Sequence, residues 1–334
     1  MDRVHDFQIF LQKFKVPEVA QPVIDDFVAL EEQQMIAALP EQFTPKDIQA
    51  ITDEMLKVTG GLAMAVDYAQ LLYQRGIFSL IKEGNPAVYT ASDEVRLEEL
   101  PKYRLSGFYE FLDVFAVSCH DTYKRFPKTI RKALDQWYFE AYSNTLSRKE
   151  ETITADESLT EDEIITADEA LFRIDHEKRQ LYLAPCDCRS LGGDCGQDLL
   201  TCLSYRDEIN SFAHRGISKP ISKEEGKRII AEAEQAGLVH TANENGMCNC
   251  CSDCCYLFRA RTRLGTGSFW PKTTSVVSVN TAICIGCGAC AKRCNFLALH
   301  VELGQLLTAP EHCVGCGLCV TVCPVEALSV QERV

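Results

Sequence analysis

The sequence lacks three features, and each absence argues against a class of function. No run of apolar residues approaches the roughly 20 that a helix needs to cross a bilayer, so membrane association would require a partner. Positive charge is also scarce. The 34 basic residues face 48 acidic ones, and the net charge of −14 argues against a general nucleic-acid binder, which needs a basic surface. No dinucleotide, P-loop or nucleophile-elbow motif supports a flavin, nicotinamide or nucleotide site.

Cysteine is nearly missing from the first half of the chain but abundant in the second. Of the 18 cysteines in the sequence, Cys119 alone lies before residue 186, and the other 17 follow it. The opening residues MDRVHDFQIF do not resemble a secretory signal peptide, so we expect a cytoplasmic protein. Disulfides are not expected in that reducing compartment. We therefore expect metal or redox chemistry in the second half of the chain.

Two cysteine runs near the end of the sequence have the spacing of iron-sulfur ligands. Residues 284–294 read CIGCGACAKRC and residues 313–323 read CVGCGLCVTVC, so each run is C-x2-C-x2-C-x3-C. A [4Fe-4S] cubane needs four thiolates, and three cysteines of such a run can wrap around one face of it. Two glycines in each run fit tight turns that bring backbone amides close to the cluster. Zinc sites also use C-x2-C pairs, but eight cysteines in this doubled order favour two clusters.

The doubled run resembles the bacterial dicluster ferredoxins. In their pattern, the last cysteine of each run ligates the cluster of the other run. The resemblance implies two ligand sets, which are Cys284, Cys287, Cys290 and Cys323 for the first cluster, and Cys313, Cys316, Cys319 and Cys294 for the second. The second run ends in Cys-Pro, as in bacteria. The first ends in Cys294-Asn295, which leaves the local turn and the environment of that sulfur open.

A second set of cysteines lies upstream and is less regular. Its nine members are Cys186, Cys188, Cys195, Cys202, Cys248, Cys250, Cys251, Cys254 and Cys255. Eight would suffice for two more cubanes, and four or five for one, with the others as buried thiols or a substrate-facing site. Structural zinc, catalytic thiols and redox sensing are alternatives. Consecutive side chains diverge, so the pairs Cys250-Cys251 and Cys254-Cys255 indicate either two ligand faces or some cysteines that do not ligate.

Two other residues near these cysteines are candidates for a role at the site. His240 could be a metal ligand, although a lone histidine near a strand is more often a hydrogen-bonded structural residue. Arg189 directly follows a candidate ligand, and it could donate a hydrogen bond to cluster sulfur or form a salt bridge.

The expected fold class is α+β with several domains. We expect a helical, winged-helix-like module with its packing helices at 1–147 and an acidic linker at 148–170. A cysteine-rich cluster-binding domain should follow at 171–270, and a dicluster ferredoxin-like domain at 271–334. Residues 41–90 carry four basic and six acidic residues, so the module is expected to dock to protein rather than to read DNA.

The N-terminal module should contain three helices and a hairpin. An apolar stripe that includes Val23 predicts the first helix, Pro45 begins the second, and residues 62–75 form the third. Strands at 77–80 and 87–89 then predict a hairpin around Gly-Asn-Pro. Three helices followed by a hairpin is the order of a winged helix.

The acidic linker contains a repeat, and regular structure should resume after it. The phrases ITADES and ITADEA begin at residues 153 and 165, which predicts a duplicated, solvated insertion. Strands are expected at 171–174 and 181–183. Ser222 and Glu225 form a capping-box pattern that opens a helix, and Gly237 should end it.

Taken together, these motifs resemble a family of cytoplasmic four-iron, four-sulfur binding proteins of anaerobes. The family has a winged-helix-like start, a CxCR element, a GLVH-x3-N segment, a CNCC-x2-CC run and a ferredoxin-type tail. Here these are Cys186 to Arg189, Gly237 to His240 with Asn243, Cys248 to Cys255, and Cys284 to Cys323. The resemblance implies multi-cluster electron transfer, commonly as an auxiliary subunit of a larger redox enzyme, and it names no substrate.

Three hypotheses about function follow. In the first, the protein relays single electrons through two C-terminal [4Fe-4S] clusters, and one or two more, to a partner oxidoreductase. In the second it is an iron-sulfur reductase whose middle cysteines hold an incompletely ligated cluster that binds substrate. In the third it is a redox-responsive regulator that uses the winged-helix-like module.

Overall fold

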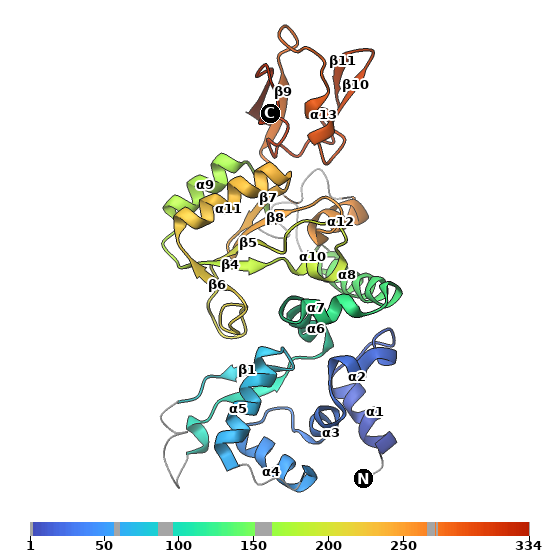
Figure 1. The fold of residues 1–334 in the computed structure, drawn as a ribbon, viewed down its shortest axis with the longest axis vertical. Coiled ribbons are helices and arrows are strands. Elements are labelled where there is room, and N and C mark those ends of the chain that lie inside the picture. The colour runs from blue at the N-terminus through green and yellow to red at the C-terminus, as the bar shows by residue number, and fades with distance from the viewer. Residues whose placement is uncertain are drawn as a thin grey trace. The chain divides into compact units, whose positions relative to one another are not determined.

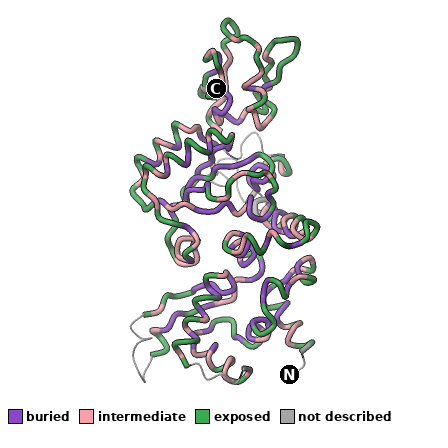
Figure 2. Tube along the Cα trace, in the orientation of Figure 1, coloured by how far each residue is buried: buried purple, intermediate pink, exposed green. Residues whose placement is uncertain are grey.

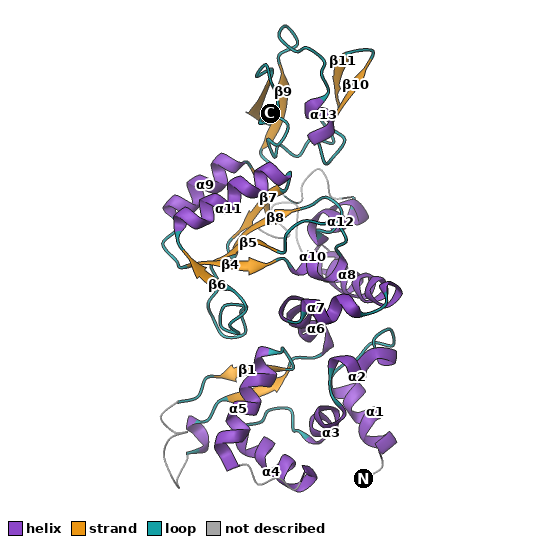
Figure 3. Cartoon of the chain, in the orientation of Figure 1, coloured by secondary structure: helices purple, strands orange, loops and turns teal. Residues whose placement is uncertain are grey.

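The structure is a computed structural model that describes residues 3–56, 61–85, 96–150, 162–265, 271 and 273–333. The chain divides into two compact units, Met1–Tyr138 with Asp207–Ile217, and Phe139–Arg206 with Ser218–Val334. Both units combine helices and strands (Figures 1 and 3), which confirms the α+β class. The sequence did not predict that residues 207–217 would belong to the first unit, because they lie inside the expected cysteine-rich domain.

Helices form most of the first unit. They are α1 (Arg3–Lys13), α2 (Ile24–Phe27), α3 (Leu30–Ala38), α4 (Pro45–Leu56), α5 (Gly61–Gln74), α6 (Phe108–Ser118), α7 (His120–Arg125) and the start of α8 (Lys128–Glu150). Aromatic rings hold several of them together. The ring of Phe27 meets those of Phe108 and Phe115 edge-on, at centroid distances of 5.6 and 4.9 Å. The helical N-terminal part therefore has an aromatic core of its own.

A two-stranded sheet follows helix α5. Gly76, at a φ of +81°, makes the turn that the sequence predicts as the end of this helix. Strand β1 (Phe78–Lys82) pairs antiparallel with β2 (Lys102–Leu105). The sequence placed the partner strand at 87–89, which lies outside the described residues. Among the described residues, the partner of β1 is β2, which the sequence did not predict as a strand.

Residues 207–217 belong to the first unit because two polar side chains fasten them to β1. Arg215 is 2% exposed and donates to the carbonyl oxygen of Phe78 at 2.9 Å and to Oγ of Ser79 at 3.0 Å. The side-chain amide of Asn210 bonds both the N–H and the C=O of Leu80, at 2.8 and 2.9 Å. These bonds satisfy backbone groups at the edge of β1, which would otherwise be left unpaired.

The second unit contains a six-stranded antiparallel sheet. Its strands, in spatial order, are β3 (Glu163–Ile165), β7 (Val239–Asn243), β8 (Gly246–Cys250), β5 (Leu200–Ser204), β4 (Leu181–Pro185) and β6 (Lys219–Ile221). Helices α9 (Ala167–His176) and α11 (Lys223–Ala236) lie side by side against it (Figure 1). Buried residues run along the strands beneath them (Figure 2). Ile174 and Ile230 pack there against Leu203 and Met247.

Helix α9 replaces a strand and part of a linker that the sequence predicted. Residues 171–174 were expected to be a strand, but they lie within α9. The helix begins with a capping box, in which the Thr166 side chain accepts a hydrogen bond from the N–H of Glu169 while the Glu169 carboxylate accepts from the N–H of Thr166. The second acidic repeat, expected to be a solvated insertion, therefore supplies the last residue of β3 and the start of α9. The first repeat lies outside the described residues.

Helix α11 forms as the sequence predicts. The Ser222 hydroxyl accepts a hydrogen bond from the N–H of Glu225 at 3.1 Å, and Gly237 ends the helix at a φ of +85°. Ala233 lies on the buried face of this helix. Two short helices complete the middle of the unit, α10 (Asp187–Gly192) and α12 (Tyr256–Leu264).

The described residues from 273 to 333 form two small sheets and one short helix. Strand β9 (Ser275–Val279) pairs with β12 (Leu328–Glu332), and β10 (Leu299–Glu302) pairs with β11 (Gln305–Thr308). Helix α13 (Ala289–Arg293) lies within the first cysteine run. Among the described residues of the whole chain, no helix is both long and apolar enough to span a bilayer.

Candidate iron-sulfur and metal sites

The first cysteine run and the end of the second line one cavity in the C-terminal part. Cys284, Cys287, Cys290 and Cys323 all contribute to its wall. These are the four residues that the sequence analysis assigned to one cluster. The wall is otherwise mostly apolar, so the thiols are the groups in it that could hold metal.

The other four C-terminal cysteines form a second group. Burial, together with the neighbouring thiols of Cys294 and Cys313, raises the pKa of Cys316 to about 12. Burial and the same neighbours also raise the pKa of Cys319. Each run thus sends its last cysteine toward the three cysteines of the other run, as the predicted ligand sets require.

Backbone conformation around these cysteines suits the approach to a cluster. The glycines at 286, 288, 315 and 317 all have positive φ, between +63° and +81°. A methyl group on Gly315 would lie 2.3 Å from the carbonyl oxygen of Ser275 in β9. The turn can therefore pack against β9 only without a side chain at this position.

Two backbone amides donate to cysteine sulfur in the same region. The N–H of Ala298 lies 3.3 Å from Sγ of Cys294, and the N–H of Ala327 lies 3.2 Å from Sγ of Cys323. Each of these cysteines is the last of its run. Asn295, which replaces the proline of the bacterial pattern, donates from Nδ2 to the carbonyl oxygen of Gly237 at 2.9 Å. Asparagine at position 295, in place of proline, therefore allows a hydrogen bond to the residue that ends α11.

Replacing Gly315 with alanine should destabilise this part of the chain strongly. The left-handed backbone alone costs about 1–3 kcal/mol for a residue with a side chain, and the collision with Ser275 adds to it. Gly288 is the matched control, because its φ of +76° is similar but a methyl group there would meet Val301 at 3.5 Å, an ordinary contact. We expect a larger fall in thermal midpoint and in bound iron for Gly315→Ala than for Gly288→Ala. Equal falls would show that the close approach to β9 is unimportant.

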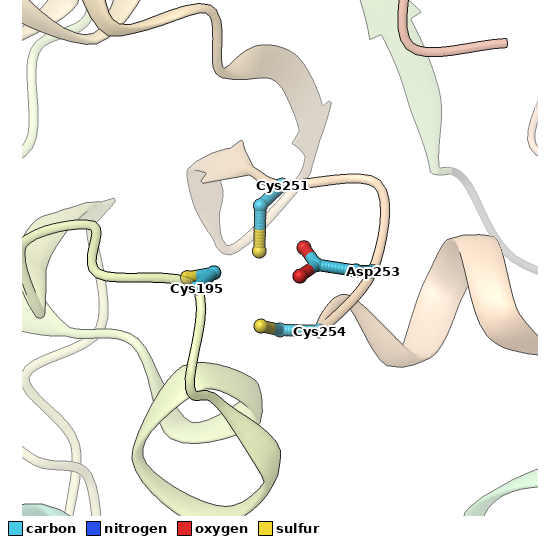
Figure 4. A group of neighbouring side chains, drawn as sticks. All are labelled: Cys195, Cys251, Asp253 and Cys254. Carbon is cyan, nitrogen blue, oxygen red and sulfur yellow. The ribbon is translucent and has the colours of Figure 1, made fainter.

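Three of the middle cysteines converge on one point together with a carboxylate (Figure 4). The ligand atoms of Cys195, Cys251, Asp253 and Cys254 all lie within 4.8 Å of one another. Cys251, Asp253 and Cys254 come from the loop between β8 and α12, and Cys195 faces them from the loop after α10. Zinc bound by thiolates at about 2.3 Å would have ligands at this spacing. The same four groups could also hold iron, with Asp253 at the exposed side.

Electrostatics within this group favour thiolate formation at one position. A hydrogen bond from Cys254 lowers the pKa of Cys251 to about 7, while the same interaction raises the pKa of Cys254. Both cysteines are buried, and they pack against Ala233 and Leu238 at the end of α11. A metal ion would replace the shared proton and bind both sulfurs as thiolates.

The remaining six middle cysteines gather in a second group. Its members are Cys186, Cys188, Cys202, Cys248, Cys250 and Cys255. The adjacent pairs are therefore separated. Cys250 and Cys255 join this group, whereas Cys251 and Cys254 turn to the three-cysteine site. The sequence indicated two ligand faces as one possibility, and the structure divides the nine cysteines into six and three.

His240 forms hydrogen bonds from both ring nitrogens and is not placed as a ligand. It is 1% exposed, with Nδ1 2.6 Å from Oδ1 of Asn249 and Nε2 3.1 Å from a carboxylate oxygen of Glu234. Asn249 donates from Nδ2 to the carbonyl oxygen of Thr201 at 2.5 Å, which orients its oxygen toward the histidine. The structural reading of His240 is therefore the one that the contacts support.

Arg189 is a buried cation between the two groups of middle cysteines. It donates to Oγ1 of Thr201 at 3.0 Å and to the carbonyl oxygen of Asn249 at 2.9 Å. It also forms a hydrogen bond with the Cys251 thiol, so one of its two expected roles, a bond to the sulfur of a candidate ligand, is present. Burial works to lower the pKa of Arg189, but Cys186 and Cys251 outweigh it and raise the pKa. One nitrogen, Nε, is buried with no hydrogen-bond partner among the described residues. This cation is placed to offset thiolate charge at both sites.

Sequence reasoning missed three residues of these sites. Asp253 stands between two ligand candidates, and a carboxylate within a cysteine run was a signal that could have been used. Glu234 and Asn249 carried no signal, because their roles depend on which strand and helix lie beside them.

Comparison with known proteins bears on the C-terminal part alone. Residues 277–330 match the family model described as a 4Fe-4S dicluster domain. The C-terminal domain is a 4Fe-4S dicluster domain. No curated protein and no solved structure matches the chain. The dicluster domain implies two [4Fe-4S] clusters, and its two groups of four cysteines, positive-φ glycines and N–H to sulfur bonds fit them.

The end of α11 joins the dicluster domain to the middle sites. Arg293 of the dicluster domain donates to the carbonyl oxygens of Glu234 and Gln235, the second at 3.0 Å. Thr321 donates to the Glu234 carboxylate at 3.0 Å, and the other oxygen of that carboxylate bonds His240. A cation at the C-terminal end of a helix also matches the sign of the helix dipole. A continuous set of hydrogen bonds therefore runs from the dicluster domain to the strand that carries Asn249.

Proposed function

We propose that this protein is an iron-sulfur electron-transfer subunit that relays single electrons between its middle cysteine sites, its dicluster domain and a partner oxidoreductase. The presence of a dicluster domain supports iron-sulfur electron transfer in general. We further propose that the middle cysteines hold additional redox centres and that the electrons pass to a partner oxidoreductase.

The chain's own residues supply the environment that such a relay needs. When bound, [4Fe-4S] clusters exchange single electrons without an organic cofactor. The eight cysteines of the two runs would hold them, and the N–H groups of Ala298 and Ala327 stabilise negative charge on two of the sulfurs. Arg189 provides the corresponding positive charge between the middle sites.

One observation carries the proposal: the last turn of α11 touches both the three-cysteine site and the dicluster domain. Ala233 and Leu238 pack against Cys251 and Cys254. Within the same stretch, the backbone oxygens of residues 234, 235 and 237 accept hydrogen bonds from Arg293 and Asn295 of the dicluster domain. These contacts support a packed connection through α11 between the two parts of the proposed relay.

The N-terminal unit is assigned a docking role in this proposal. It contains helices α1 to α7 and the β1–β2 sheet, while the cysteine groups lie in the other unit. A separate helical unit is suited to contacting a catalytic partner while the iron-sulfur unit exchanges electrons.

Counting electrons tests the relay. Anaerobically reconstituted protein should accept clearly more than the about two electrons, one per cubane, that the dicluster domain takes up alone. The titration uses a one-electron dye followed by electron paramagnetic resonance. Asp253→Asn, which keeps the shape of the side chain, should leave the dicluster signal unchanged. If the wild-type chain takes up only about two electrons, the middle cysteines take no part in the relay.

A second candidate function is favoured by one feature of the three-cysteine site. Three thiols and an exposed carboxylate leave a cluster there with a replaceable ligand, so the protein could be an iron-sulfur reductase that binds substrate at Asp253. An accessible iron would bind cyanide and shift the visible and electron paramagnetic resonance spectra. A spectrum that cyanide does not change favours electron transfer without substrate binding.

A further inference from the structure

The six cysteines outside the three-cysteine site form a closed ring of neighbouring thiols. Each thiol interacts with the one before it and the one after it. In order around the ring they are Cys186, Cys188, Cys255, Cys250, Cys248 and Cys202. We refer to this group as the six-thiol ring.

The backbone independently places these cysteines together. Leu203 of β5 pairs with Met247 of β8, so the next residues along, Cys202 and Cys248, lie beside each other. Cys186, Cys188 and Cys202 pack in one cluster with Ala184 at the end of β4. The N–H of Tyr256, directly after Cys255, lies 3.5 Å from Sγ of Cys188 and so connects the two sides of the ring.

The spacing of the six-thiol ring differs from that of a site for one metal ion. Among the described residues, the compact group with ligand atoms within 4.8 Å of one another is the one around Cys195, and the ring does not form such a group. Among the described residues, the cysteines of the dicluster domain do not form such a group either. In this respect the ring resembles the dicluster cysteines and differs from the site around Cys195.

The ring divides into two halves that come from different parts of the chain. Cys202, Cys186 and Cys188 are consecutive around it and come from β5, the end of β4 and α10. Cys255, Cys250 and Cys248 are also consecutive and come from β8 and the turn before α12. Each half offers three thiols, which is one fewer than an isolated cubane requires.

We infer that the six-thiol ring is the site of one eight-iron, iron-sulfur cluster, in which two four-iron halves share a bridging inorganic atom and each half is held by three thiolates. Sharing an atom supplies the fourth corner of both halves, so all six cysteines are used. Two separate cubanes would need eight thiolates, and one cubane would leave two thiols of the ring idle. The inference stands independently of where the protein sends its electrons.

Hydrogen-bond donors from outside the ring distinguish four of its cysteines from the other two. Cys188 accepts a hydrogen bond from the N–H of Tyr256, and Sγ of Cys250 lies 3.7 Å from the Thr241 hydroxyl. Cys202 and Cys255 accept hydrogen bonds from backbone N–H groups. Such donors are typical of cluster ligands, as at Cys294 in the dicluster domain. The side-chain hydrogen bonds found for Cys186 and Cys248 among the described residues are with neighbouring thiols of the ring. Cys186 nevertheless lies in the ring between Cys202 and Cys188, and Cys248 lies between Cys202 and Cys250. Each of the two is therefore the third thiol of its half of the ring.

Single serine substitutions at these two positions decide between the readings. Full-length chains would be reconstituted anaerobically in a background carrying Cys251→Ser and Cys254→Ser, so that the three-cysteine site does not contribute iron. Cys188→Ser is the positive control, since both readings make it a ligand. We expect Cys186→Ser and Cys248→Ser each to lose iron and change the Mössbauer spectrum as Cys188→Ser does. If either variant keeps the full iron content and spectrum, the inference is wrong.

The amount of iron gives a second, independent measurement. Replacing Cys186, Cys188 and Cys202 together should remove about eight irons per chain, whereas a single cubane would account for about four. The electron paramagnetic resonance signal of the dicluster domain should remain, which shows that the chain has folded. If the serine background does not fold, the triple substitution is made in the natural chain and compared with that chain. A loss of about four irons in either comparison overturns the inference.

Discussion

Removing iron with a chelator under anaerobic conditions should unfold the dicluster domain while the N-terminal unit stays folded. The domain has two sheets of two strands each and one short helix. Its apolar core is small and includes Leu299 and Leu328, which pack directly on Cys290 and Cys319. Domains of this size rarely bury enough apolar surface to fold alone, and the free energy of metal binding then becomes free energy of folding.

Hydrogen exchange measured peptide by peptide is the test of this expectation. Amides of β9 and β12 should lose their protection by several orders of magnitude when iron is removed. Those of α6, whose residues Phe111 and Leu112 are fully buried in an aromatic core, should not change. Protection of β9 that survives complete removal of iron would show that the small apolar core is sufficient.

Cys323→Ser and Cys294→Ser should each abolish one cluster of the dicluster domain and leave the other in place. Cys323 shares its cavity with the first run, and Cys294 lies with Cys316 in the other group. Each substitution removes one of four thiolates, so we expect a loss of about four irons per chain and about half of the dicluster spin intensity. Because the last cysteines are exchanged between runs, the damage should appear at the cluster of the other run.

Mixed substitutions show which cluster is lost. Cys323→Ser combined with Cys287→Ser should lose no more iron than Cys287→Ser alone, because both changes affect one site. Cys294→Ser combined with Cys287→Ser should lose iron from both sites. Cys119→Ser is the control, since Cys119 lies in the N-terminal unit. The reverse pattern would mean that each run ligates its own cluster.

Much of the helical structure could be predicted from short-range signals. Ser222 and Gly237 mark the two ends of α11, and Pro45 begins α4, because caps and proline act through bonds within one turn. Helix α9 was missed for a related reason. The apolar side chains within residues 171–174 suit either a strand or a buried helix, and the Thr166 capping box that decides between them lies in what resembled an acidic repeat.

The strand pairings were harder to predict. The partner of β1 is β2, and residues 207–217 join the first unit through Arg215 and Asn210. Both depend on contacts between segments far apart in the chain, and no local pattern marks which segments will meet.

The sequence by itself determined the class of cofactor. The C-x2-C-x2-C turn is local, so its spacing alone brings three thiolates within reach of one cubane, and doubling it calls for two. The tertiary structure alone decided how the nine middle cysteines divide. The antiparallel register of β5 and β8 sets Cys202 beside Cys248, and the turn after β8 points Cys251 and Cys254 away from Cys250 and Cys255. A site assembled from several strands depends on their register and on the direction of each side chain, and both are set by packing across the whole sheet.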